Sequence, residues 1–149
     1  MKFSVIIPVF NKADTIPTSL NSVFAQTYRD FEIIVVNDGS TDNIQQVLSQ
    51  YEGLVVINQE NAGVSAARNA GINKAQGEYL CFLDADDIYF PNHLSVLNEL
   101  INKYPSNGFY CTSHIETFAD GDNIDSSIRL PEFIKKSSDY NCDNLFKLV

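Results

Sequence analysis

The stretch Phe31–Asp42, "FEIIVVNDGSTD", decides the fold class of this 149-residue chain. Its segment Ile33–Val36 is a continuous apolar run, which is typical of a strand buried on both faces in a parallel sheet. The polar residues after it end the strand, because Gly39, Ser40 and Thr41 suit a turn and Asp42 suits the N-cap of a following helix. A buried strand that leads through a short turn into a helix predicts an α/β protein.

The same alternation of strand and helix extends in both directions from this stretch. The predicted strands are residues 3–8, 31–36, 54–57, 78–83 and 109–115. The predicted helices are residues 16–25, one that follows Asp42 and ends near Tyr51, residues 64–75, and one that starts at Pro91. After Thr117 the pattern weakens, and "ADGDNIDSS" is interpreted as a polar loop. This alternation predicts a Rossmann-like, mostly parallel sheet with helices on both faces.

Composition excludes several classes of partner and location. A net charge of −9 argues against nucleic acid, which is bound by fields of Lys and Arg. The apolar runs are far shorter than the roughly 20 residues of a membrane helix, and the chain starts in a strand pattern without the features of a signal peptide. The three cysteines are odd in number and lack metal-ligand spacing. We therefore expect a reduced, cytoplasmic setting.

A cluster of acidic residues follows the fourth predicted strand, in Cys81–Phe90, "CFLDADDIYF". Side chains two apart on an extended segment share a side, so Asp84 and Asp86 can aim at one point while Asp87 points away. Ligands of open parallel sheets bind beyond the carboxyl ends of the strands, where Asp38 is also expected. Oxygen ligands suit Mg²⁺ or Mn²⁺, which proteins hold with one or two carboxylates and substrate phosphates. The sequence therefore predicts a metal–diphosphate site.

A single arginine stands near this cluster in the sequence. Arg68 is the only arginine between Arg29 and Arg129, and its neighbours Ala66, Ala67 and Ala70 are small enough to let a nucleotide or another backbone approach. The first strand is followed by "PVFNKAD" and not by a G-x-G-x-x-G turn, which argues against a dinucleotide-dependent dehydrogenase.

Four segments, "SVIIPVFN", "VVNDGSTDN", "NAGVSAARNAGI" and "GEYLCFLDADD", occur in an order and spacing that resembles the nucleotide-binding half of a family 2 glycosyltransferase. The resemblance covers residues 3–115 and implies an A-type glycosyltransferase fold. It also implies inverting transfer of a hexosyl or N-acetylhexosaminyl group from a nucleotide-sugar donor, with a UDP-sugar expected. The implied acceptor is a glycan, a lipid or another hydroxyl compound, as in polysaccharide biosynthesis.

The resemblance also implies roles for individual residues. Pro8, Val9 and Phe10 would line the base pocket, and Asp38 would bind the uracil-type ring. Asn61 and Arg68 would lie near the base and the phosphates. Asp84 would face the ribose, Ala85 would be a further substrate-binding residue, and Asp86 would hold Mn²⁺ or Mg²⁺ on the diphosphate.

The chain departs from the family pattern after the acidic cluster. The family places its general base in the second half of the domain, and the surroundings of Asp139 and Asp143 do not match that motif, so no catalytic base is assigned. We expect residues 1–115 to bind the donor and residues 116–149 to start an incomplete acceptor-side region of a fragment. The alternative is a non-catalytic nucleotide-binding or assembly module. Peripheral attachment to the inner face of a membrane and the oligomeric state stay open.

Overall fold

The computed structural model describes residues 1–105, 108–110, 112, 115–117 and 123–125. The chain divides into two compact units, Met1–Ser95 and Val96–Val149, and each is described by itself. The sequence predicts a different division, between a donor-binding part that ends at residue 115 and an acceptor-side region after it. That division is one of function, and it stays a prediction.

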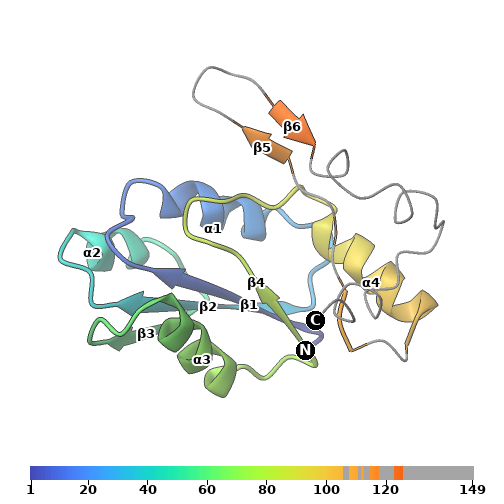
Figure 1. Ribbon diagram of the computed structural model, residues 1–149, viewed down its shortest axis with the longest axis horizontal. Helices are drawn as coiled ribbons and strands as arrows, with labels where there is room; N and C mark the ends of the chain where they lie inside the picture. Colours follow the sequence, from blue (N-terminus) through green and yellow to red (C-terminus); the bar gives the residue numbers. More distant parts are fainter. Residues whose placement is uncertain (106–107, 111, 113–114, 118–122, 126–149) are drawn as a thin grey trace, which may run out of the picture. The chain divides into compact units, whose positions relative to one another are not determined.

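The first unit is built on a parallel sheet of four strands in the order β3-β2-β1-β4 (Figure 1). The strands are β1 (Phe3–Val9), β2 (Phe31–Asp38), β3 (Leu54–Gln59) and β4 (Tyr79–Phe82). The helices are α1 (Ile16–Phe24), α2 (Ile44–Leu48), α3 (Val64–Lys74) and α4 (His93–Lys103), the last of which begins in the first unit. This arrangement confirms the predicted fold class.

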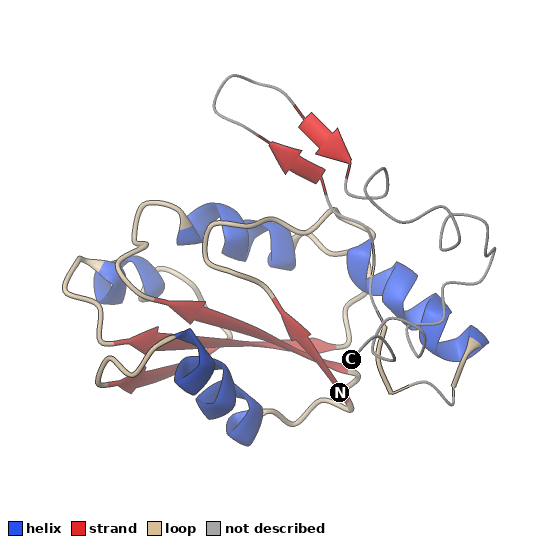
Figure 2. Cartoon of the chain, viewed as in Figure 1, coloured by secondary structure: helices blue, strands red, loops and turns tan. Residues whose placement is uncertain are grey.

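The order of the strands reverses at β1. From β1 the chain proceeds outward through β2 to β3, and then α3 carries it back to β4 on the other side of β1. Helices α1 and α2 lie on one face of the sheet and α3 on the other (Figures 1 and 2). Ligands of open α/β sheets bind beyond the carboxyl ends of the strands at such a reversal. A ligand site is therefore expected at the loops after β1 and β4.

The core explains the small residues around Arg68. Ala67 is fully buried in a cluster with Ile6 and residues of β2, and Ala70 packs against the same cluster. At Gly71, a Cβ atom would lie 2.5 Å from Cγ2 of Ile6. The small side chains therefore let α3 approach the sheet, so for Ala67 and Ala70 it is the second of the two expected alternatives, the close approach of another backbone, that the structure shows.

Several predicted boundaries shift by one to three residues. Pro8 does not end the first strand, because β1 continues to Val9 with Pro8 paired to Val36. Strand β2 extends through Asn37 and Asp38, both of them buried. Helix α4 begins at His93, two residues after Pro91.

The second unit contains a short antiparallel pair, β5 (Ile115–Thr117) and β6 (Asn123–Asp125). Two predictions are corrected here. Residues 109, 110 and 112 are not in a strand, and residues 111, 113 and 114 of the predicted fifth strand lie outside the described residues. The segment interpreted as a polar loop contains β6. Across the described ranges, none of the helices has both the length and the apolar content that a bilayer crossing requires.

Candidate functional site

The loops after β1 and β2 are joined by hydrogen bonds at the carboxyl edge of the sheet. The backbone N–H of Asn11 donates to Oγ of Ser40 at 3.0 Å, and the N–H of Thr41 donates to Oδ1 of Asn11 at 2.8 Å. Asn11 has a φ of 52°, a left-handed conformation that asparagine tolerates better than most residues. The two loops therefore support each other at this edge.

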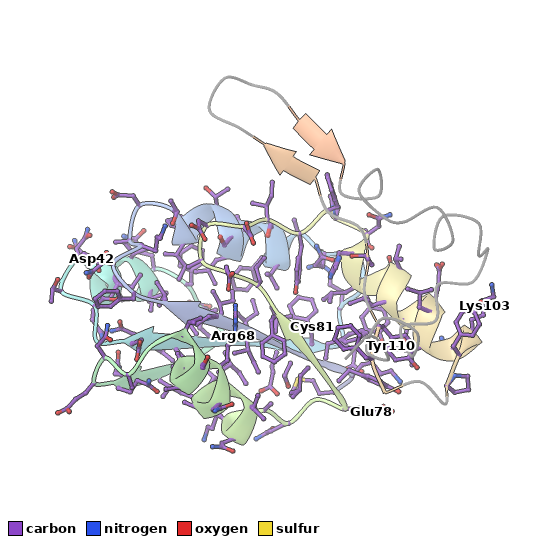
Figure 3. The ribbon with its side chains drawn as sticks, in the orientation of Figure 1. Asp42, Arg68, Glu78, Cys81, Lys103 and Tyr110 are labelled. Carbon is purple, nitrogen blue, oxygen red and sulfur yellow. The ribbon has the colours of Figure 1, made fainter. Side chains whose placement is uncertain are left out.

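Asp42 also connects the two loops, although the sequence predicts it only as the N-cap of the following helix. Its Oδ2 accepts the N–H of Ala13 at 2.9 Å, and its Oδ1 accepts the N–H of Ile44 at 3.3 Å. The N-cap of α2 is Asn43, so the predicted N-cap was one residue early. Asp42, labelled in Figure 3, joins the start of α2 to the loop after β1.

Asp38 is 3% exposed and accepts three hydrogen bonds from the segment before α3. Gln59 Nε2 at 2.7 Å and the N–H of Ala62 at 2.9 Å donate to Oδ1, while the N–H of Gly63 donates to Oδ2 at 2.8 Å. Burial favours a higher pKa for Asp38, but the donors from Ala62, Gln59 and Gly63 outweigh it and lower the pKa below its usual value. A carboxylate has about four acceptor sites, so these donors leave room for one more partner.

Gly39 brings the loop after β2 against Asn61. It has a φ of 74°, and a Cβ atom added there would lie 2.7 Å from the backbone nitrogen of Asn61. Only glycine combines this backbone conformation with so close an approach. Asn61 itself is exposed, and its role in binding a base stays a prediction.

The acidic loop continues the alternation of β4. Leu83 and Ala85 are each 4% exposed, whereas the side chains of Asp84 and Asp86 are each 48% exposed. The two carboxylates thus leave the core at alternate positions, as the sequence indicated. Their negative charge is available at the edge of the sheet where the first loops meet.

Each of these carboxylates holds one basic side chain. Nη2 of Arg68, on α3, lies 2.7 Å from Oδ1 of Asp84. Nζ of Lys12, in the loop after β1, lies 2.8 Å from Oδ2 of Asp86. The Lys12 hydrogen bond lowers the pKa of Asp86, and the Asp86 hydrogen bond raises the pKa of Lys12. Two cations from different elements therefore converge on the acidic loop.

Arg68, labelled in Figure 3, has donor capacity left over. Its Nε is buried and has no hydrogen-bond partner among the described residues. An unpaired buried donor is costly, so an acceptor brought by a ligand would be favourable there. This orphaned atom is consistent with the expected place of Arg68 near an anionic ligand.

Residues that flank helix α1, Thr15 before it and Gln26 after it, anchor the acidic loop and the segment that follows it. Oγ1 of Thr15 donates to the carbonyl of Ala85 at 2.9 Å. Gln26 is fully buried; its Nε2 donates to the carbonyl of Phe90 at 2.7 Å, and its Oε1 accepts the N–H of Leu94 at 2.9 Å. The Thr15 bond fixes the backbone between Asp84 and Asp86, and the Gln26 bonds fix the segment that leads from the acidic loop into α4.

The remaining predicted residues differ in what they present to solvent. Pro8 and Val9 are buried in β1, and only the Phe10 side chain of that segment is exposed, by 46%. The Ala85 side chain is buried and its carbonyl is taken by Thr15. Any contact of Pro8, Val9 or Ala85 with a ligand would therefore be made by backbone atoms.

The donor set fits a hard divalent cation that shares its coordination with a ligand. In the part of the chain that the structure describes, no three His, Cys, Asp or Glu side chains gather to hold a metal by themselves. Asp84 and Asp86 each use one oxygen in an ion pair and are half exposed. One or two carboxylates completed by substrate phosphates are the usual environment of Mg²⁺ in nucleotide sites.

Sequence reasoning missed Lys12, Thr15 and Gln26. Lys12 had a usable signal, because it is the basic residue in "PVFNKAD", which follows the first predicted strand, and the loops after parallel strands meet at one edge of a sheet. Thr15 and Gln26 act through backbone groups far along the chain, for which periodicity carries no signal.

Residues 4–145 match the family model described as Glycosyl transferase family 2. The chain is 46% identical over 107 residues to an uncharacterized glycosyltransferase of Rickettsia conorii, covering 67% of this chain and 18% of that protein. It is 40% identical over 107 residues to the glycosyltransferase GlyA of Streptococcus pneumoniae, covering 69% of this chain and 15% of that protein. The chain thus spans less than a fifth of the length of these two relatives.

Solved structures share the fold. TarS 1-349 of S. aureus in complex with UDP-GlcNAc is 28% identical with a TM-score of 0.68, covering 81% of this chain and 42% of that chain. The mannosyltransferase PcManGT of Pyrobaculum calidifontis, in complex with GDP-Man and Mn²⁺, is 25% identical with a TM-score of 0.62, covering 72% of this chain and 33% of that chain.

Proposed function

The chain belongs to glycosyl transferase family 2, and on that premise we propose that it binds a nucleotide-sugar donor, expected to be a UDP-sugar, for inverting transfer to a glycan, lipid or other hydroxyl acceptor. The observation that carries the proposal is the pair Asp84 and Asp86, each half exposed at the strand-order reversal and each matched by one cation. Isolated carboxylates at this edge would repel an anionic donor. Carboxylates combined with two cations and a metal would bind one.

The proposed division of labour follows the positions of the side chains. Asp86 would hold Mn²⁺ or Mg²⁺ together with the donor's diphosphate, and Asp84 would face the ribose. Arg68 would use its unpaired Nε toward the donor while it keeps Asp84 in place. Asp38 and Asn61 would contact the base beside the exposed ring of Phe10. When bound, the metal would stabilise the negative charge that develops on the leaving diphosphate.

Inversion also needs a group that takes the proton of the attacking hydroxyl. No residue is assigned to this task, since Asp139 and Asp143 lie outside the described residues and match no base motif. We also propose that the transferred sugar is a hexosyl or N-acetylhexosaminyl group and that the acceptor carries the attacking hydroxyl. The compared structures support a nucleotide-sugar donor in general, because TarS is in complex with UDP-GlcNAc and PcManGT is in complex with GDP-Man.

A non-catalytic nucleotide-binding or assembly module is the second candidate, since no general base is assigned among the described residues. Release of free sugar from a labelled UDP-sugar, or its transfer to an acceptor, would favour the enzyme. Donor binding with neither reaction would favour the module.

The substitution Asp86→Ala tests the proposed site. We expect it to abolish the metal-dependent part of UDP-sugar binding and to leave the melting temperature nearly unchanged, because an exposed ion pair contributes little to stability. Asp87→Ala removes the same charge one residue later and should keep metal-dependent binding. Isothermal titration with and without Mn²⁺ measures both variants. Unchanged metal dependence in Asp86→Ala, or a large drop in its melting temperature, would contradict the assignment.

A further inference from the structure

We propose that Lys12 is an exchangeable counter-ion: it holds Asp86 while no metal is bound, and it moves to the donor's diphosphate when the metal takes that carboxylate. This inference rests on the proposed function and deepens it, since it adds a phosphate-binding residue and a step of charge exchange to the donor site. It concerns a residue that neither the sequence pattern nor the comparisons assign.

The contact that Lys12 makes is short but easily replaced. Its Nζ lies 2.8 Å from Oδ2 of Asp86, with the two side chains 45% and 48% exposed. Exposed ion pairs are weak because water competes for both charges and because holding two long side chains costs entropy. A divalent cation carries twice the charge of the ammonium group and is the stronger partner for a carboxylate oxygen.

The backbone of Lys12 is held while its side chain is free to move. The N–H groups of its neighbours Asn11 and Ala13 donate to Ser40 and Asp42, and Asn11 also accepts from Thr41. The backbone around Lys12 is thereby held at the carboxyl edge of the sheet. A lysine side chain has a flexible four-carbon stem and a compact ammonium group, so it can change partner without movement of the loop.

Arg68 shows the opposite properties. It lies on α3, a helix packed on β1 and β2, and its Nε is buried. Its planar guanidinium keeps a fixed geometry, which suits it to orient Asp84 rather than to exchange partners. Of the two cations on the acidic loop, Lys12 is therefore the one suited to move.

Electrostatics sets the direction of the exchange. A metal ion on Asp86 would place a second positive charge beside the Lys12 ammonium, and the two cations would repel each other. The donor's diphosphate arrives with the metal and offers the ammonium negative oxygens at the same edge. Lys12 thus opposes metal binding in the absence of a nucleotide and favours nucleotide binding in the presence of metal.

The variant Lys12→Met tests this proposal, because the two effects have opposite signs. Without nucleotide, we expect Mn²⁺ to bind about two- to fivefold more tightly, measured by the loss of the free-ion electron paramagnetic resonance signal. With saturating Mn²⁺, we expect UDP to bind about tenfold more weakly by isothermal titration, since a charge-assisted contact is lost. Uridine, which has no phosphate, should bind equally well to both proteins.

Two further variants serve as controls. Lys74→Met removes the same charge in the last turn of α3 and should change none of these affinities. Lys12→Arg keeps the charge and should retain most of the UDP affinity. Weaker Mn²⁺ binding by Lys12→Met, equal loss for uridine and UDP, or unchanged UDP affinity would each overturn the inference while the proposed function stands. If the wild-type chain binds no UDP with Mn²⁺, the proposed function and the inference fail together.

Discussion

Asp38 shows how one side chain can organise a site before any ligand arrives. It ends β2, is almost fully buried, and accepts hydrogen bonds from Gln59, Ala62 and Gly63. These bonds position the residues that lead into α3, the helix that carries Arg68. The predicted contact of Asp38 with a base therefore depends on a carboxylate that is already held in place by the protein.

The substitution Asp38→Asn should lower the free energy of unfolding by about 2 kcal/mol at pH 7, because an amide offers one acceptor oxygen where the carboxylate offered two. The native pKa of Asp38 lies below its usual value of about 3.9, so its stabilising effect is complete above that pH and is lost as pH falls through the native pKa. Urea denaturation should therefore show a difference between variant and wild type that shrinks from pH 7 to pH 2.

Asp14→Asn is the matched control, since Asp14 is exposed at the same edge and should change stability little. Equal stability of Asp38→Asn and wild type at pH 7 would show that the three hydrogen bonds do not hold the segment before α3.

Between the elements, the acidic loop depends on α1 for its position. Thr15 bonds the carbonyl of Ala85, Oγ of Ser22 accepts the N–H of Tyr89 at 3.0 Å, and Gln26 bonds backbone groups of Phe90 and Leu94. The loop from the acidic pair to the start of α4 is thereby attached to a helix that is itself packed on the sheet. This attachment explains how a loop with exposed carboxylates can keep a defined shape.

The substitution Gln26→Leu should lower the free energy of unfolding by about 2 to 4 kcal/mol, because the carbonyl of Phe90 and the buried N–H of Leu94 lose their partner. It should also weaken metal-dependent UDP binding, since the acidic loop loses an anchor. Gln50→Leu makes the same chemical change at an exposed position and serves as the control. A Gln26→Leu protein as stable as Gln50→Leu would contradict the anchoring role.

At the scale of the whole molecule, an acidic protein has to bind a negatively charged donor. The chain has a net charge of −9, and yet the family to which it belongs acts on glycosyl donors. The structure places Lys12 and Arg68 against Asp84 and Asp86 beside the reversal in strand order. An acidic protein can bind an anionic donor at such a point if local cations and a metal overcome the overall repulsion.

Sequence reasoning predicted the parts of the fold that depend on local pattern. The apolar run at Ile33–Val36 predicts a buried strand, and residues 64–75, ended by Gly77, are predicted as a helix; the structure confirms both, as β2 and α3. The hairpin of β5 and β6 was missed because two three-residue strands show no measurable period. In the site, the acidic pair was visible in one segment, whereas the partners of Asp38 and Asp86 come from other elements. Such contacts are determined by the tertiary fold, and the local sequence pattern does not predict them.

The central claim is that the carboxyl edge of this sheet binds a nucleoside diphosphate together with a divalent cation. Isothermal titration of the wild-type chain with UDP, with Mn²⁺ and then with EDTA in its place, tests this claim most directly. We predict saturable binding with Mn²⁺ and at least tenfold weaker binding without it, since the metal joins the carboxylates to the diphosphate. Absence of binding under both conditions, or equal affinity in both, would contradict the account.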